Sequence, residues 1–195
     1  LCDRPIRLSN GREVVSPVGA QVAKIEAECM LVFGQGQVLD TTRDLLGHVL
    51  GDVPLRPVFS GVAAGLAALS PSDIEHGALV IDLGGGVTEY CVYKSPGCFH
   101  TGQVTVGCEH LVNDLHIGLK LESNECAAVL RDLPRYGSVI LKDDGGKRRM
   151  PVGSGVVSKR EVPVAAVEQI VDLRLRELFG VIRDDLLSHN ALERV

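Results

Sequence analysis

An aspartate, three glycines and a threonine form the segment of this chain whose residue types and spacing suit a chemical role. The sequence Asp82-Leu-Gly-Gly-Gly-Val-Thr-Glu follows residues 77–81 (Gly-Ala-Leu-Val-Ile), an apolar run typical of a buried strand. Glycines let the backbone approach a bulky anion, and their N–H groups can point toward it together. We therefore predict that residues 84–86, with the hydroxyl of Thr88, bind phosphate groups.

Asp82 adds a second kind of chemistry to this segment. A carboxylate repels a bare phosphate, so its place beside the glycines makes sense if Mg²⁺ lies between the two, bound directly or through water. We predict that Asp82 holds Mg²⁺ in this way. A glycine turn that only joins two strands of a hairpin remains the simpler alternative.

Two well-known phosphate-binding motifs do not fit this segment. A P-loop leads from a strand into a helix and carries Gly-Lys-Ser or Gly-Lys-Thr, a triplet that the sequence lacks. The dinucleotide-binding motif also continues into a helix, whereas residues 87–93 (Val-Thr-Glu-Tyr-Cys-Val-Tyr) favour a strand. The pattern indicates a β-hairpin with a glycine turn.

The elements that must position this turn indicate an α/β chain. Helices are expected at 41–50, 61–69, 109–119, 123–133 and 163–187, and strands at 12–16, 21–33, 55–59, 77–81, 87–93 and 98–106. Asp40 or Thr41 is the expected N-cap of the first helix and Ser60 that of the second, while Pro134 should lie just beyond the fourth. Two further strand-like pieces fall within residues 137–161.

Composition excludes several classes of function. The net charge is −5 and aromatic residues make up 4% without any Trp, which argues against broad nucleic-acid binding and base stacking. The six cysteines include no C-x-x-C pair, so a zinc site is not expected. No apolar run approaches the roughly 20 residues of a membrane span.

Three stretches resemble one family. Residues 79–93 resemble the second phosphate motif of the superfamily of actin, sugar kinases and heat-shock chaperones. Residues 107–119 are similar to the stretch that follows this hairpin in FtsA-type bacterial cell-division proteins, and residues 16–28 resemble their extra subdomain. The resemblance covers essentially the whole chain, in the order of the family.

The resemblance implies an α/β, actin-like (ribonuclease-H-like) ATPase fold, a mixed sheet with helices, truncated at both ends. Residues 1–54 would be a remnant of the extra subdomain, 55–107 with 163–195 the lobe that carries the glycine hairpin, and 108–162 a smaller inserted lobe. Other parts of the family's nucleotide site would lie outside the chain, so we expect this chain by itself to bind ATP weakly or not at all.

The implied function is that of an ATP-binding protein that polymerises and tethers FtsZ to the inner face of the cytoplasmic membrane at the division septum. Asp82, Gly84, Gly85, Gly86 and Thr88 fall on phosphate and Mg²⁺ positions, and Gly107 on a glycine near the nucleotide. The membrane would be reached through a C-terminal helix of the full protein, and ATPase activity would be weak at most.

The alternative is another ATP-binding protein of the superfamily, of the pilus-assembly type or a sugar kinase. A kinase needs a base that activates the acceptor hydroxyl, and no carboxylate of the chain is evidently placed for that role. We therefore expect no catalytic set in this chain.

Two sets of polar residues each allow a structural and a functional interpretation. Basic residues at Arg148, Arg149, Lys159 and Arg160 suit a solvated loop, but the resemblance implies a docking face for the acidic C-terminal peptide of FtsZ. The polar residues Glu109, Asn113, Asp114 and His116 could ligate a metal, but the solvated face of a helix is favoured, with Glu109 stabilised at its N-terminus.

Overall fold

The computed structural model describes residues 5–51, 53–95, 97–136, 147–152 and 160–194. The chain forms two compact units, the first from residues 1–82, 90–101 and 190–195 and the second from residues 83–89 and 102–189. This division differs from the predicted one, which grouped residues 163–195 with 55–107. The long C-terminal helix packs within the second unit instead.

The N-terminal residues form a small antiparallel sheet. Its central strand β1 (Ile6–Leu8) pairs with β2 (Glu13–Val14) on one side and β3 (Ile25–Glu26) on the other. The strand predicted at 21–33 is wrong in length, since only Ile25 and Glu26 pair. Nearly all side chains from 21 to 33 are exposed, so the alternating pattern finds no buried face that would stabilise a longer strand.

Helix α1 (Gly36–Leu50) begins earlier than predicted. Its N-cap is Gln35, so neither Asp40 nor Thr41 caps it; the Thr41 hydroxyl donates instead to a backbone carbonyl one turn earlier. Gly51 ends the helix with a φ of 74°, as its position in the sequence predicts. No residue of α1 is buried.

Helix α2 (Ser60–Ala68) confirms the predicted small, apolar helix but not its cap. Phe59 is the N-cap, and Ser60 is the first helical residue. Residues 55–59, predicted as a strand, form none. They are exposed except for Leu55 and Phe59, which are half-buried, and they lack the neighbouring strand that a buried apolar strand requires.

Glycines let α2 approach strand β5 (Thr88–Lys94) closely. A Cβ added to Gly65 would lie 2.1 Å from the Tyr93 hydroxyl oxygen. That hydroxyl lies 3.2 Å from the carbonyl oxygens of both Gly61 and Val62, which share its single hydrogen as acceptors. The core of the first unit gathers the buried residues Val62, Cys91, Tyr93 and Cys98.

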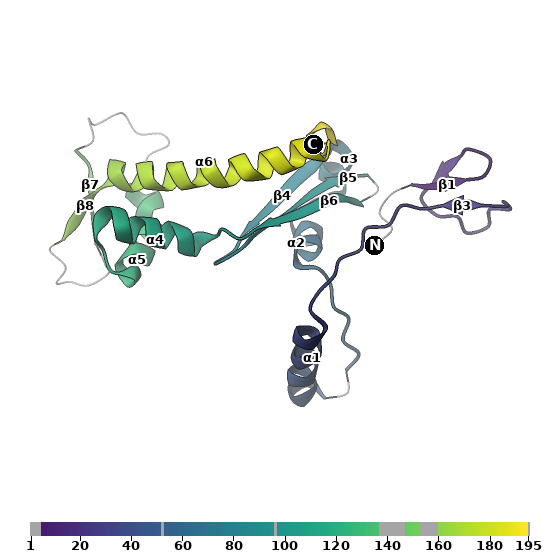
Figure 1. Ribbon diagram of the computed structural model, residues 1–195, viewed down its shortest axis with the longest axis horizontal. Helices are drawn as coiled ribbons and strands as arrows, with labels where there is room; N and C mark the ends of the chain where they lie inside the picture. The colour runs from purple at the N-terminus through teal and green to yellow at the C-terminus, as the bar shows by residue number, and fades with distance from the viewer. Residues whose placement is uncertain (1–4, 52, 96, 137–146, 153–159, 195) are drawn as a thin grey trace. The chain divides into compact units, whose positions relative to one another are not determined.

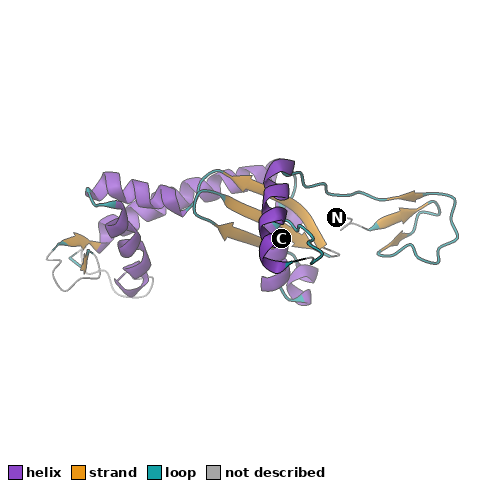
Figure 2. Ribbon diagram, turned by 90° about the horizontal axis from the view of Figure 1, so that it is seen from below, coloured by secondary structure: helices purple, strands orange, loops and turns teal. Residues whose placement is uncertain are grey.

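The central sheet has the order β4 (Ala78–Leu83), β5, β6 (Gly97–Val104), as labelled in Figure 1. Figure 2 shows strands in orange. Connections of residues 84–87 and 95–96 are too short for a parallel crossover, so neighbouring strands are antiparallel. The predicted hairpin and third strand are confirmed. A short helix that was not predicted, α3 (Pro71–His76), precedes β4 and begins with a Ser70–Asp73 capping box.

The second unit packs helices α4 (Cys108–Leu119), α5 (Ser123–Tyr136) and α6 (Val164–Ser188) around one core. The two-stranded ladder of β7 (Arg149–Pro151) and β8 (Glu161–Pro163) joins them at the start of α6 (Figure 1). The core consists of Leu115, Leu121, Cys126, Val129, Met150, Val152, Val162, Val164 and Val167. Because Val164 and Val167 are buried there, α6 belongs with α4 and α5.

Pro134 does not end α5, contrary to the prediction. The helix runs two residues further, to Tyr136. The missing amide of a proline costs one hydrogen bond near the helix end. Leu133 and Tyr136 pack against the core of the unit, and this burial favours the two additional helical residues. Among the described residues, no helix is both long and apolar enough to cross a membrane.

Candidate functional site

The glycine segment forms a tight turn between β4 and β5. The amide of Gly84 donates to the carbonyl oxygen of Val87 at 3.1 Å and closes the turn. A Cβ on Gly84 would lie 2.6 Å from that same oxygen, which is closer than real Cβ atoms come to an oxygen. The turn therefore requires glycine at this position.

The N-terminus of α4 is joined to this turn through the backbone. The amides of Cys108 and Glu109 donate to the carbonyl oxygens of Gly84 and Gly85, each at 2.9 Å. A Cβ on Gly107 would lie 2.3 Å from the Gly85 oxygen and 2.5 Å from the Gly84 oxygen. Gly107, predicted to lie near a nucleotide, thus allows the turn and the helix to meet.

Two amides of the turn remain available. Gly85 and Gly86 are exposed, and their N–H groups donate no hydrogen bond to any residue that the structure describes. They lie beside the start of α4, where the helix dipole favours negative charge. Exposed amides next to a helix N-terminus form an environment that favours an anion.

Thr88 has a different role from the one predicted. Its side chain is fully buried, and its hydroxyl donates to the carbonyl oxygen of Val106 at 2.6 Å. A hydroxyl has one hydrogen to donate, and this one is used to hold β5 to the segment that leads into α4. The prediction that it donates to a phosphate is therefore wrong for this structure. Asp82, which precedes the turn in sequence, is exposed.

Glu109 and His110 contribute to the site in a way that the sequence did not indicate. The Glu109 carboxylate faces the turn, with one oxygen 3.3 Å from the place where a Cβ of Gly85 would be. The His110 Nδ1 atom accepts the amide hydrogen of Gly107 at 3.1 Å and so caps α4. Their positions two and three residues after Gly107, in the first turn of a predicted helix, were the signal that could have revealed them.

The other polar residues of α4 do not gather around a metal. Asp114 accepts two hydrogen bonds from Arg174 of α6, at 2.6 and 2.9 Å, and His116 Nδ1 contacts the Leu121 carbonyl. In the described part of the chain, no cluster of metal-ligating side chains includes Glu109, Asp114 or His116. Asp114 is thus paired with α6, whereas the simpler prediction placed it on a solvated helix face.

The predicted basic residues lie on and beside the β7–β8 ladder, where each described arginine contacts neighbouring backbone. Arg148 donates to the Tyr136 carbonyl at 2.8 Å, Arg149 to that of Glu161 at 2.9 Å, and Arg160 to that of Lys120 at 2.9 Å. Arg149 and Arg160 also lie 3.4 and 3.9 Å from the carboxylates of Glu161 and Glu125. Lys159 lies outside the described residues.

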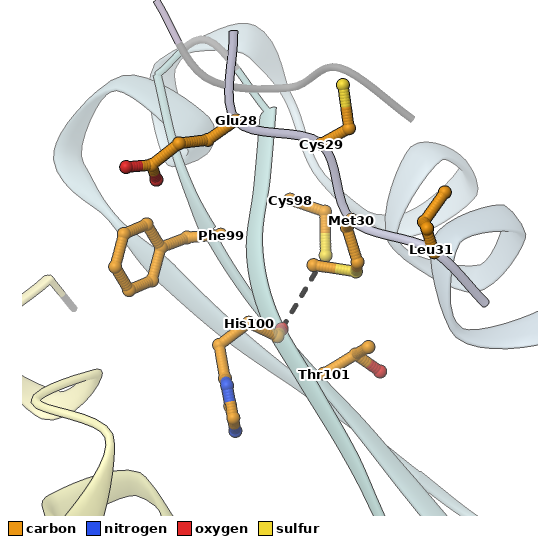
Figure 3. Close-up of a pocket in the computed structure, with 8 residues that line it drawn as sticks. All are labelled: Glu28, Cys29, Met30, Leu31, Cys98, Phe99, His100 and Thr101. Carbon is orange, nitrogen blue, oxygen red and sulfur yellow. Dashed lines mark hydrogen bonds between the residues drawn. The ribbon is translucent and has the colours of Figure 1, made fainter.

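A separate hollow lies in the first unit. It has a volume of about 540 Å³ between residues 28–31 and residues 98–101 of β6 (Figure 3). The Cys98 thiol, near its wall, donates to the His100 carbonyl at 3.6 Å. None of the predicted site residues lines this hollow, so it is distinct from the glycine turn.

Comparison with curated proteins finds several FtsA proteins. No protein-family model matches the chain. Cell division protein FtsA of Neisseria meningitidis is 25% identical over 179 residues, 89% of this chain and 41% of that protein. FtsA of Bacillus subtilis is also 25% identical, over 90% of this chain and 39% of that protein. FtsA of Agrobacterium fabrum is 33% identical over 63% of this chain and 28% of that protein.

Solved structures agree on the fold. MreB5 of Spiroplasma citri bound to AMPPNP matches 98% of this chain and 71% of its own with a TM-score of 0.53 at 14% identity. The structure of the same protein bound to ADP matches 98% of this chain and 70% of its own, with a TM-score of 0.54 at 15% identity. At this identity the likeness shows the fold alone.

The chain spans about two fifths of the length of the first two FtsA relatives. The chain has a mixed α/β, actin-like fold and is a distant homologue of the bacterial cell-division protein FtsA over most of its length.

Proposed function

We propose that this chain binds the phosphates of ATP at the turn of residues 84–86, as part of an FtsA-like protein that polymerises and tethers FtsZ to the cytoplasmic membrane at the division septum. The observation that carries the nucleotide proposal is the pair of exposed amides at Gly85 and Gly86, held against the N-terminus of α4. The nucleotides bound to the MreB5 structures support it.

The residues present suit a phosphate and its cation. The turn excludes a Cβ at Gly84, and Gly107 keeps the helix N-terminus within hydrogen-bonding distance of the turn. Gly85 and Gly86 would donate their amides to phosphate oxygens. Asp82, adjacent in sequence and exposed, would hold Mg²⁺, which neutralises phosphate charge when bound.

Amide resonances of the turn test the phosphate proposal, even for weak binding. We expect Mg·ATP at millimolar concentrations to shift the ¹⁵N–¹H signals of Gly85 and Gly86 in a saturable way, because their N–H groups would exchange water for phosphate oxygens. Adenosine, which lacks phosphates, is the matched control ligand. Equal shifts with adenosine, or ATP binding that leaves both signals unchanged, would contradict the proposal.

Partner binding is the second part of the proposal. Homology to FtsA supports division-protein partners, and we place the acidic C-terminal peptide of FtsZ on the surface of Arg148, Arg149 and Arg160, with Lys159. The arginines are partly engaged with backbone carbonyls, but a guanidinium has five N–H donors and retains capacity for a carboxylate.

Charge reversal tests this surface. Replacing Arg148, Arg149 and Arg160 with glutamate should weaken FtsZ-peptide binding at least about tenfold, because attraction becomes repulsion. Arg176→Glu on α6, outside this surface, is the control for net charge. Circular dichroism must show that the triple variant is folded. Unchanged peptide affinity in a folded triple variant would refute the docking surface.

A further inference from the structure

Glu109 is held over the glycine turn by the backbone of its own helix. Its amide donates to the Gly85 carbonyl at 2.9 Å, so its backbone cannot move away from the turn without breaking this hydrogen bond. Its two carboxylate oxygens lie 3.3 Å and 3.9 Å from the places where Cβ atoms of Gly85 and Gly86 would be. One carboxylate therefore faces both glycines whose amides are available.

This placement has an electrostatic consequence. The N-terminus of α4 and the two glycine amides favour negative charge, and in this structure the Glu109 carboxylate provides it. A phosphate that approached the same amides would meet a like charge a few ångströms away. Since repulsion between like charges rises as their distance and the local dielectric constant fall, a bare polyphosphate is disfavoured here.

We infer that Glu109 makes phosphate binding at this turn dependent on a divalent cation, an inference that rests on the proposed function. A hard cation such as Mg²⁺ takes oxygen ligands from carboxylates and phosphates together. Placed between Glu109 and the phosphate, it turns a repulsive pair into a bridged one. Glu109 is thus the residue that selects magnesium-complexed polyphosphate over the free form.

The test compares free and magnesium-complexed tripolyphosphate, followed through the amide signals of Gly85 and Gly86. For the unaltered chain, the magnesium complex should bind at least about fivefold more tightly than the free anion, within the range usual for coupling between two bound species. In Glu109→Gln the free anion should bind more tightly than it does to the unaltered chain, and the preference for the complex should fall to the part that Asp82 alone supplies. Glutamine keeps the shape of the side chain, removes its charge and replaces one acceptor oxygen with an N–H donor.

Glu125→Gln is the matched control, because Glu125 also lies in the first turn of a helix of this unit but pairs with Arg160 and the amide of Glu122. It should retain the magnesium preference. The same preference in Glu109→Gln as in the unaltered chain would overturn the inference and leave the proposed function standing. The absence of a saturable response to any polyphosphate, in either protein, would overturn both.

Discussion

At the residue scale, the site depends on where a side chain is impossible. Gly107 is in extended backbone with a φ of −152°, a conformation open to any residue. What requires glycine there is the backbone of the turn, since a Cβ would meet the oxygens of Gly84 and Gly85 at 2.5 and 2.3 Å. Backbone oxygens that are themselves hydrogen-bonded cannot move aside without breaking those bonds.

Gly107→Ala should separate the turn from α4. We expect it to destabilise the protein by about 1–3 kcal/mol, as overpacking does, and to weaken phosphate binding at Gly85 and Gly86. Gly180→Ala in α6 is the matched control, because a Cβ there meets nothing within 4 Å, and it should stabilise the helix by about 0.5–1 kcal/mol. Chemical unfolding measures both. If Gly107→Ala left the free energy of unfolding unchanged, the close contact between the turn and α4 would be contradicted.

At the element scale, one ion pair ties α4 to α6. Asp114 and Arg174 are 60 residues apart, and each side chain is 23% exposed. The hydrogen bonds that Arg174 donates to the Asp114 carboxylate raise the pKa of Arg174 above its ordinary value. A base with a raised pKa contributes its stabilisation at every pH below its unfolded value and loses it only as the pH rises through the folded value, so the pair acts throughout the neutral range.

A double-mutant cycle measures this pair. Asp114→Ala and Arg174→Ala should show a coupling of about 1–2 kcal/mol, as expected for residues in a two-bond contact between helices. The exposed i,i+4 pair Asp172–Arg176 on the same helix should give only about 0.3–0.5 kcal/mol. Free energies of unfolding at about pH 6 and about pH 8 should give the same coupling. Equal coupling free energies for the two pairs would mean that partial burial does not strengthen the Asp114–Arg174 pair.

At the scale of the whole molecule, burial is uneven. Leu115 and Val167 are fully buried in the core of α4, α5 and α6, whereas α1 has no buried residue. In α1, Leu45 and Val49 are 63% and 81% exposed. An isolated helix of this length is marginal in water, because most helical stability in proteins comes from packing.

Hydrogen exchange should reflect this difference. We expect amides of α1 to exchange far faster than those of α4 and α6, since opening α1 exposes little additional apolar surface. Leu115→Ala should cost about 2–5 kcal/mol, and Leu45→Ala should change the free energy of unfolding by less than about 0.5 kcal/mol. Mass spectrometry of exchange and chemical unfolding are the measurements. Protection of α1 equal to that of α6 would contradict the expected difference.

The elements that the sequence predicted well are those with a strong local signal. The hairpin of residues 77–93 and helices α4 and α6 combine apolar periodicity with glycine or proline at their ends, and these signals depend only on neighbours in the chain. The strand predicted at 21–33 failed because alternation stabilises a strand only where one face is buried. Pro134 failed as a stop signal because Tyr136 gains burial by continuing the helix.

By itself, the sequence of this chain determined the glycine turn, its strands and the likeness to FtsA, because each rests on residue types at short spacing. Only the tertiary structure decided that the Thr88 hydroxyl binds Val106, that Glu109 faces Gly85 and that Arg174 pairs with Asp114. These contacts depend on how separate segments pack against one another, and no local pattern encodes which side chain will face which backbone once they meet.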